Sequence, residues 1–143
     1  MPRLLLILSL SFVPWFATTP AQAADCPNIN AHPGITTVIV QDDYGEKDQS
    51  AKAYVVALQD AIKKSPNFCL VEDVRAATYA LDVAGIDIDE DHERAALSVV
   101  IVSERGMMVS HWVRMSSVSN VDKNGEDDLH KVDRVIRRVK RQK

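Results

Sequence analysis

Apolar residues recur along this chain in two periods, and each period predicts one type of element. From residue 48 to residue 65 they follow the three- and four-residue spacing of a helix with one buried face, at Ala51, Tyr54, Val55, Leu58, Ala61 and Ile62. Asp48 or Ser50 can cap the start of this helix, and Ser65 followed by Pro66 stops it. The same spacing returns near the carboxyl end, at Leu129, Val132, Val135, Ile136 and Val139. The pattern therefore predicts two amphipathic helices.

The remaining apolar segments have the shorter period that is typical of strands. Residues 35–40 form a β-branched run, residues 68–73 a short second strand, and residues 78–88 alternate between apolar and small or polar positions. Residues 96–116 contain two long strands around a tight turn at residues 103–106, where Gly106 supplies a positive φ. The polar stretch "SNVDKNGEDD" before the last helix predicts a loop.

These elements occur in the order β-α-β-β-β-β-α, which predicts an α+β fold. A two-layer sandwich satisfies all the apolar stripes: a mostly antiparallel sheet of about five strands, with both helices on one face. The first strand-helix-strand unit can be parallel within that sheet. No internal repeat or low-complexity stretch indicates a second domain.

The chain begins with features that direct export. Arg3 is followed by the uncharged run "LLLILSLSFVPWFA", and Ala21, Gln22 and Ala23 form a small-residue cleavage site. The run is shorter than the roughly 20 apolar residues that span a bilayer. We therefore expect residues 1–23 to be a cleaved signal peptide and residues 24–143 to be one small domain, with no transmembrane segment left after cleavage. An uncleaved membrane anchor is the alternative.

Two cysteines bear on the same question of location. Asp25 precedes Cys26, whereas a lipid-modified cysteine is preceded by a small residue, so we do not expect a lipoprotein. Cys69 is the second cysteine of the chain, and exported proteins meet an oxidising compartment. The sequence predicts a Cys26–Cys69 disulfide and a periplasmic or secreted protein, with two unpaired thiols as the alternative.

The charge is slightly acidic and unevenly distributed. A formal net charge of −3 argues against general nucleic-acid binding, which needs a basic surface. Basic residues gather in the last helix, and four of them are candidate interface residues, namely Arg134, Arg137, Arg138 and Arg141. They either favour the negative end of the helix dipole or make weak contact with anionic polymer or lipid.

Candidate chemistry is sparse. Asp87, Asp89 and Asp91 alternate in "DIDEDHE" and form a weak candidate cation site, but the twelve-residue calcium loop would need glycine where His92 stands. The four histidines lack zinc-ligand spacing, and no nucleophile motif or glycine-rich phosphate loop is present. We therefore expect neither a cofactor nor catalysis.

A second group of candidate interface residues lies in the last strand. Ser110, Trp112 and Arg114 alternate with His111 and its apolar neighbours, and Trp and Arg are favoured in protein interfaces. The alternative for Trp112 is a position covered by the second helix.

The element order resembles that of bacterial envelope domains, namely the amino-terminal domain of TolB and CsgG-like domains. The resemblance rests on the strand "TTVIV", the helix that ends in "IKKSPNFCLVED", then "ATYALDVAGIDI", the hairpin "LSVVIVSERGMMVSHWV" and a final helix. It covers roughly residues 35–140 as topology rather than as a motif, and "YGEKDQSAK" replaces the glycine-rich helix entry of those domains. The resemblance implies a non-enzymatic periplasmic role.

The sequence thus favours an exported, non-enzymatic binding or envelope-assembly adaptor that contacts another envelope protein. A small-ligand or cation-binding periplasmic protein is the first alternative, and a small hydrolase that uses Ser110 and His111 is the second.

Overall fold

The computed structural model describes residues 34–142, which form seven main elements and two short 3-10 turns. The strands and helices in chain order are β1 (Thr36–Tyr44), α1 (Gln49–Lys64), β2 (Phe68–Leu70), β3 (Tyr79–Asp87), β4 (Arg94–Ser103), β5 (Met108–Ser117) and α2 (Val121–Arg141). The 3-10 turns η1 (Val74–Ala76) and η2 (Val118–Asn120) precede β3 and α2. The predicted order and the α+β class are confirmed.

The five strands form one sheet in the order β2-β1-β3-β4-β5. β1 pairs in parallel with β2 and with β3, whereas β3 with β4 and β4 with β5 are antiparallel. The sheet is therefore mixed, and its two antiparallel pairs are longer than its two parallel pairs. At the start of β3, Thr37 Oγ1 accepts the backbone N–H of Thr78 at 2.9 Å, which ties this strand to β1.

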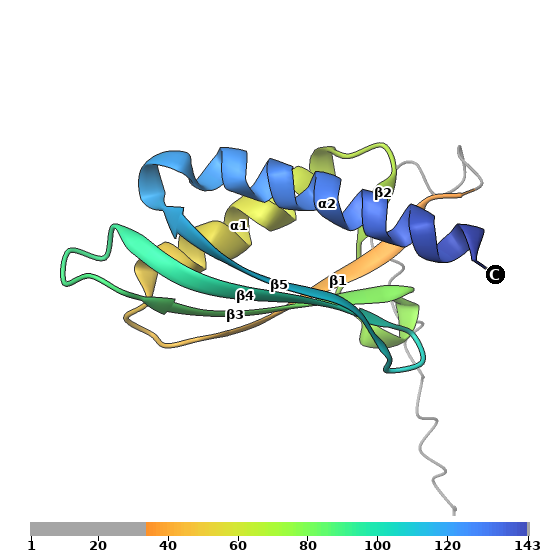
Figure 1. Ribbon diagram of the computed structural model, residues 1–143, viewed down its shortest axis with the longest axis horizontal. Coiled ribbons are helices and arrows are strands. Elements are labelled where there is room, and N and C mark those ends of the chain that lie inside the picture. Colours follow the sequence, from red (N-terminus) through yellow and green to blue (C-terminus); the bar gives the residue numbers. More distant parts are fainter. Residues whose placement is uncertain (1–33, 143) are drawn as a thin grey trace, which may run out of the picture.

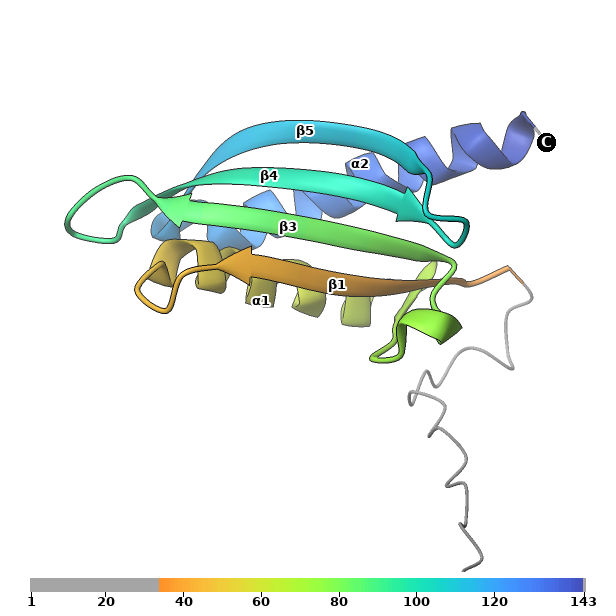
Figure 2. The same cartoon turned by 90° about the horizontal axis from the view of Figure 1, so that it is seen from below.

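Both helices cover one face of this sheet, and the other face carries no helix (Figures 1 and 2). Alternate residues of the inner strands point toward the helices and are fully buried, among them Val38, Leu81 and Val99. α1 inserts Tyr54, Leu58 and Ile62 into the same core, as its apolar spacing predicts. The two-layer arrangement leaves the outer face of β1, β3, β4 and β5 as a surface.

α2 differs from the prediction at its start. It begins at Val121, inside the polar stretch predicted as a loop, which contains the turn-favouring pair Asn124 and Gly125. Gly125 is instead buried within the helix, where an added Cβ would lie 3.0 Å from the backbone carbon of Ala57. The missing side chain lets α2 approach α1 closely, and this packing overrides the turn preference.

Two smaller predictions can be compared directly. The turn between β4 and β5 is present, and Gly106 has a φ of +71° as expected. The second strand is shorter than predicted, because β2 ends at Leu70 and the chain then enters η1.

Candidate functional site

A cluster of polar side chains is buried between the sheet and the helices. Asp128 on α2 is its centre: it accepts the indole N–H of Trp112 at 3.1 Å and the phenol of Tyr54 on α1. Arg114 on β5 forms an ion pair with the same carboxylate at 2.8 Å. The Asp128 carboxylate thus connects α2 with α1 and β5. Burial, and then the neighbouring Asp128 carboxylate, raises the pKa of the Tyr54 phenol.

Further contacts fix the outer side of this cluster. Arg114 donates to the backbone oxygen of Asn124 at 2.9 Å and to its side-chain oxygen at 2.6 Å. The Lys131 ammonium lies 4.2 Å from the centre of the Trp112 ring, a cation–π contact. These bonds attach the first half of α2 to β5.

The structure therefore shows where the candidate interface residues of β5 lie. Ser110, Trp112 and Arg114 point toward α2, and Trp112 is buried. Of the two alternatives for Trp112, the structure has the one in which the second helix covers it. Sequence reasoning missed Asp128, because it was assigned to a loop, although it precedes Leu129 in the helical spacing.

The acidic turn between β3 and β4 closes the start of α1. The side chain of Asp87 is only 2% exposed, and its carboxylate accepts the backbone N–H groups of Ser50 at 3.2 Å and Ala51 at 3.1 Å. His92 Nδ1 lies 2.9 Å from the same carboxylate. Asp48, the expected cap, forms no capping bond to its own helix and accepts the N–H of Asp87 at 3.0 Å instead.

The three aspartates of this turn do not converge. Asp89 accepts the Arg94 side chain at 2.9 Å, and this bond holds the pKa of the Asp89 carboxyl below its usual value. Asp91 is exposed. Among residues 34–142 no three His, Cys, Asp or Glu side chains gather as metal ligands. In this structure Asp87 and Asp89 order the turn and cap a helix.

The four candidate arginines of α2 lie along its second half and are exposed. Arg137 pairs with Asp133 at 2.8 Å, one helical turn earlier. Nearby, Lys140 donates to Thr36 Oγ1 at 2.9 Å, which ties the end of α2 to the start of β1. For all four candidates, which also include Arg134, Arg138 and Arg141, a role in binding stays a prediction.

The predicted disulfide involves one described residue. Cys69 is buried on β2, beside Thr37 of β1. Cys26 lies outside the described residues, as does the predicted signal peptide, so both predictions stand as made.

The face of the sheet away from the helices has an unusual apolar surface. Large apolar side chains lie on it at exposures of 60% for Ile86, 70% for Met108, 66% for Val113 and 56% for Met115. β4 is apolar on both faces, with Val99 in the core and Val100 on this open side. A strand that is apolar on both sides is typical of a sheet that is covered on both sides. We call the outward-pointing residues of β1, β3, β4 and β5 the open face.

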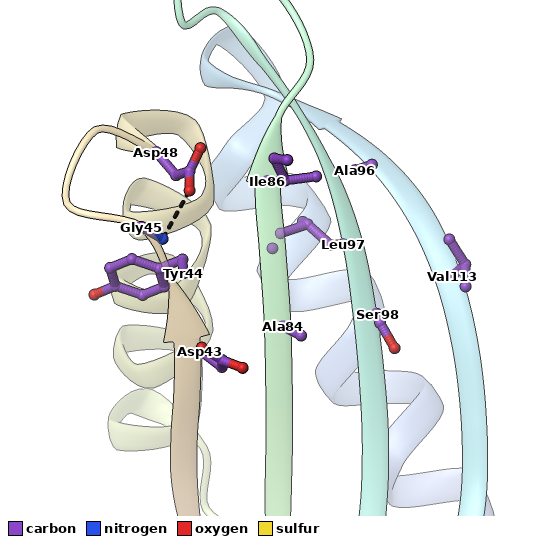
Figure 3. A pocket seen from close by; sticks show the side chains of 11 residues that line it. Asp43, Tyr44, Gly45, Asp48, Ala84, Ile86, Ala96, Leu97, Ser98 and Val113 are labelled. Carbon is purple, nitrogen blue, oxygen red and sulfur yellow. Dashed lines mark hydrogen bonds between the residues drawn. The ribbon is translucent and has the colours of Figure 1, made fainter.

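One end of the open face is hollowed (Figure 3). The hollow has a volume of about 570 Å³, and small residues of β3 and β4 form its floor, namely Ala84, Gly85, Ala96 and Ser98. Val113 bounds it on β5, and Asp43 and Tyr44 bound it where β1 ends.

A single charged group lies in the middle of the open face. Asp82 on β3 is half-buried, and its Oδ1 atom has no hydrogen-bond partner within the part of the chain that the structure describes. Burial raises the pKa of this carboxyl. On the edge strand β5, which β4 separates from β3, His111 Nε2 lies 3.2 Å from Ser98 Oγ. Sequence reasoning missed Asp82, whose only signal was its place in an alternating strand.

Known proteins resemble this chain only distantly. No family model matches the chain, and no curated protein matches it significantly. Among solved structures, the PelC dodecamer from Paraburkholderia phytofirmans is 12% identical, with a TM-score of 0.43 over 66% of this chain and 81% of that chain. Protein XCC0632 from Xanthomonas campestris is 10% identical, with a TM-score of 0.45 over 71% of this chain and 82% of that chain. At such low similarity nothing about function follows.

Length and hydropathy decide whether a helix can cross a bilayer. Within residues 34–142, neither α1 nor α2 is both long enough and apolar enough to do so.

Proposed function

We propose that this protein is an exported, non-enzymatic binding module that assembles with another protein through the open face of its sheet. The observation that carries the proposal is the group of exposed apolar side chains on β3 and β5, opposite a face that two helices cover. Contiguous apolar surface on a folded domain marks a site of interaction. The export and envelope part of the proposal rests on the leader at residues 1–23.

The chemical groups of the domain support binding rather than catalysis. Asp87, Asp89 and Asp128 are engaged with helix amides or arginine side chains, so their carboxylates hold the fold together. Ser110 and His111 are neighbours on a strand and therefore point to opposite faces, which keeps them from acting as a pair. His111 instead lies beside Ser98 on the open face, where the backbone amides on both sides of Ser98 belong to strand pairing and are not free to bind a reacting oxygen.

Crosslinking in living cells tests this proposal. A photoreactive residue at Val113 would sample the open face, and the same residue at Val56 would be the control. Val56 is a comparably exposed valine, but it lies on α1, on the helical side of the molecule. We expect a discrete protein adduct from Val113 and none from Val56. Adducts from Val56 alone, or from neither position, would contradict the proposal.

A second candidate function is the binding of a small apolar ligand in the hollow beside β1. Its volume of about 570 Å³ lies in the range of small-molecule sites, which is about 300–1,000 Å³. A ligand there would lie on Ala84 and Ala96, so Ala84→Leu would fill the site. Loss of a metabolite's binding in Ala84→Leu, with protein adducts at Val113 unchanged, would favour this candidate.

A further inference from the structure

We propose that the open face binds a second copy of this chain, and that a twofold axis along β4 relates the two sheets face to face. The inference rests on the proposed function, because it names the partner of the same surface. Three features of the open face argue for it: the register of its side chains, the place of its charges, and its size.

The strand register fixes which residues of the open face lie in one row. One row crosses the sheet from Asp82 on β3 through Val100 on β4 to His111 on β5. The next row toward the hollow runs from Ala84 through Ser98 to Val113. The outermost row runs from Ile86 through Ala96 to Met115, and the row at the other end joins Ala80, Val102 and Met108.

A twofold axis along β4 exchanges the flanking strands between the copies. Each residue of β3 then faces the residue of β5 from the same row of the other copy. Ala84 would face Val113 of the second copy and Ala80 would face Met108, so in these two rows a small side chain opposes a large exposed one. In the outermost row Ile86 would face Met115, and two large apolar side chains would meet. Val113 of the second copy would enter the hollow over Ala84 and Ser98. Layers in stacked sheets interdigitate in this way, at a spacing of about 10 Å.

The same axis brings opposite polar groups together. Within one chain, Asp82 and His111 lie two strands apart, about 10 Å, too far for a hydrogen bond. Across the axis, Asp82 faces His111 of the second copy, and the pair occurs twice. When Ser98 donates to His111 Nε2, the imidazole carries its proton on Nδ1 and can donate it to a carboxylate. The orphan oxygen of Asp82 thereby gains a partner.

A twofold axis perpendicular to the strands would not give Asp82 a polar partner of opposite character. An axis that crosses the strands would place β3 over β3, so that Asp82 would face itself or an apolar neighbour. An unpaired buried carboxylate is costly, and a pair of like charges is costlier still.

The size and rim of the face fit a dimer of modest stability. The three overlapping strands β3, β4 and β5, about 30 Å long and about 4.8 Å apart, cover roughly 430 Å², and side-chain relief adds to that area. A standard interface buries about 800 Å² on each partner. On β1 the outward residues Gln41 and Asp43 would lie beyond the edge of the second copy's β5, as a polar rim.

Light scattering on the exported, purified protein over a range of concentrations tests the proposal. We expect a reversible dimer, and a dissociation constant at least about tenfold higher for Val113→Asp, which buries a charge in the interface. Val56→Asp is the matched control and should leave the dimer intact. Thermal unfolding of each variant separates loss of association from loss of fold. A wild-type protein that stays monomeric at every soluble concentration overturns the proposal.

A mixing experiment tests the twofold arrangement itself. Asp82→Lys alone puts an ammonium opposite the Nδ1–H donor of His111 and removes its acceptor, and His111→Asp alone places two carboxylates together, so each variant should dimerise at least about tenfold more weakly. Mixed in equal amounts they should form a heterodimer, because the introduced ammonium of one copy then faces the introduced carboxylate of the other. Failure to form this heterodimer, while the wild type dimerises, overturns the axis along β4.

The outcomes also separate this inference from the proposed function. A monomeric protein whose Val113 position still crosslinks to a different protein in cells refutes the second copy and keeps the binding role. A protein that neither dimerises nor crosslinks at Val113 refutes both.

Discussion

The carboxylate of Asp87, at the end of β3, accepts the backbone N–H of Ala51 in the first turn of α1 at 3.1 Å. A strand thus caps a helix from another part of the chain. A second hydrogen bond runs in the opposite direction, because the Asp48 carboxylate accepts the backbone N–H of Asp87 at 3.0 Å. The exchange fixes where the start of the helix lies against the sheet, beside the hollow of the open face.

Removal of this cap should destabilise the domain. Asp87→Ala leaves two amides at the start of α1 without their acceptor, so we expect a loss of about 1–3 kcal/mol in the free energy of unfolding. Urea unfolding followed by circular dichroism measures it. Asp91→Ala, in the same turn but exposed, is the control and should change stability by less than about 0.5 kcal/mol. Equal effects of the two substitutions would contradict the capping role.

The buried cluster around Asp128 makes a larger prediction. Asp128→Ala leaves Arg114 half-buried without its counter-ion and removes the acceptor of Trp112, so we expect a loss of about 3–5 kcal/mol. The adjacent and exposed Asp127→Ala should be nearly neutral. Trp112 is the only tryptophan in residues 24–143, so in a chain that lacks residues 1–23 its fluorescence reports on this cluster directly. An unchanged emission spectrum and stability in Asp128→Ala would refute the account.

At Gly125, helix propensity and packing against α1 predict opposite effects of a substitution by alanine. Gly→Ala inside a helix normally stabilises by about 1 kcal/mol. Here the new methyl group would lie 3.0 Å from the backbone of α1, which cannot move aside as a side chain would. We expect Gly125→Ala to destabilise by about 1–3 kcal/mol. His130→Ala, an exposed position of α2, should be neutral or slightly stabilising, and a stabilising Gly125→Ala would show that the helices have room.

These residues also show what the sequence could and could not predict. The helix 48–65 was predicted almost to its ends, because its apolar stripe meets a sheet core that any two-layer fold would provide. The start of α2 was missed because the pair Asn124 and Gly125 has a strong local preference for turns, and only contact with α1 reverses it. Sequence patterns predict an element when its own residues determine where it starts and ends. The start of α2 is determined instead by its packing against α1.

The candidate site was harder to predict than the fold. Trp112 and Arg114 have the composition of an interface, but their burial depends on where α2 lies, and that was unknown from spacing alone. The open face was visible as alternation in residues 78–88 and as a strand at residues 95–102 in which Ser98 is the one polar residue. The sequence did not predict what lies against the open face. An amphipathic pattern indicates that one face of an element is buried, but it does not indicate what packs against the opposite face.

The disulfide remains a prediction with a direct test. Alkylation of the exported protein under denaturing, non-reducing conditions should modify no thiol, and peptide mapping should recover Cys26 joined to Cys69. Reduction should lower the free energy of unfolding by about 2–4 kcal/mol. Cys26→Ser and Cys69→Ser should each reproduce this loss if they break the same bond, whereas two modifiable thiols in the wild type would refute the pairing.

Asp82 should make stability depend on pH, because burial raises the pKa of its carboxyl above the unfolded value. A raised pKa means that the folded chain binds the proton more tightly than the unfolded chain. Its contribution to stability is therefore fully present below the unfolded pKa of about 3.9 and is lost as pH rises through the folded pKa. Asp82→Asn removes the ionised form while keeping the shape of the side chain.

In dilute solution, where the chain is a monomer, Asp82→Asn should raise the melting temperature at neutral pH, and the gap to the wild type should close as pH falls toward about 4. Asp91→Asn removes the same charge from an exposed site and should show no such gap. At concentrations that favour the dimer the sign should reverse, because the amide is a weaker acceptor for His111 of the second copy than the carboxylate. A variant that is less stable than the wild type even when dilute would show that Asp82 has a favourable partner within its own chain.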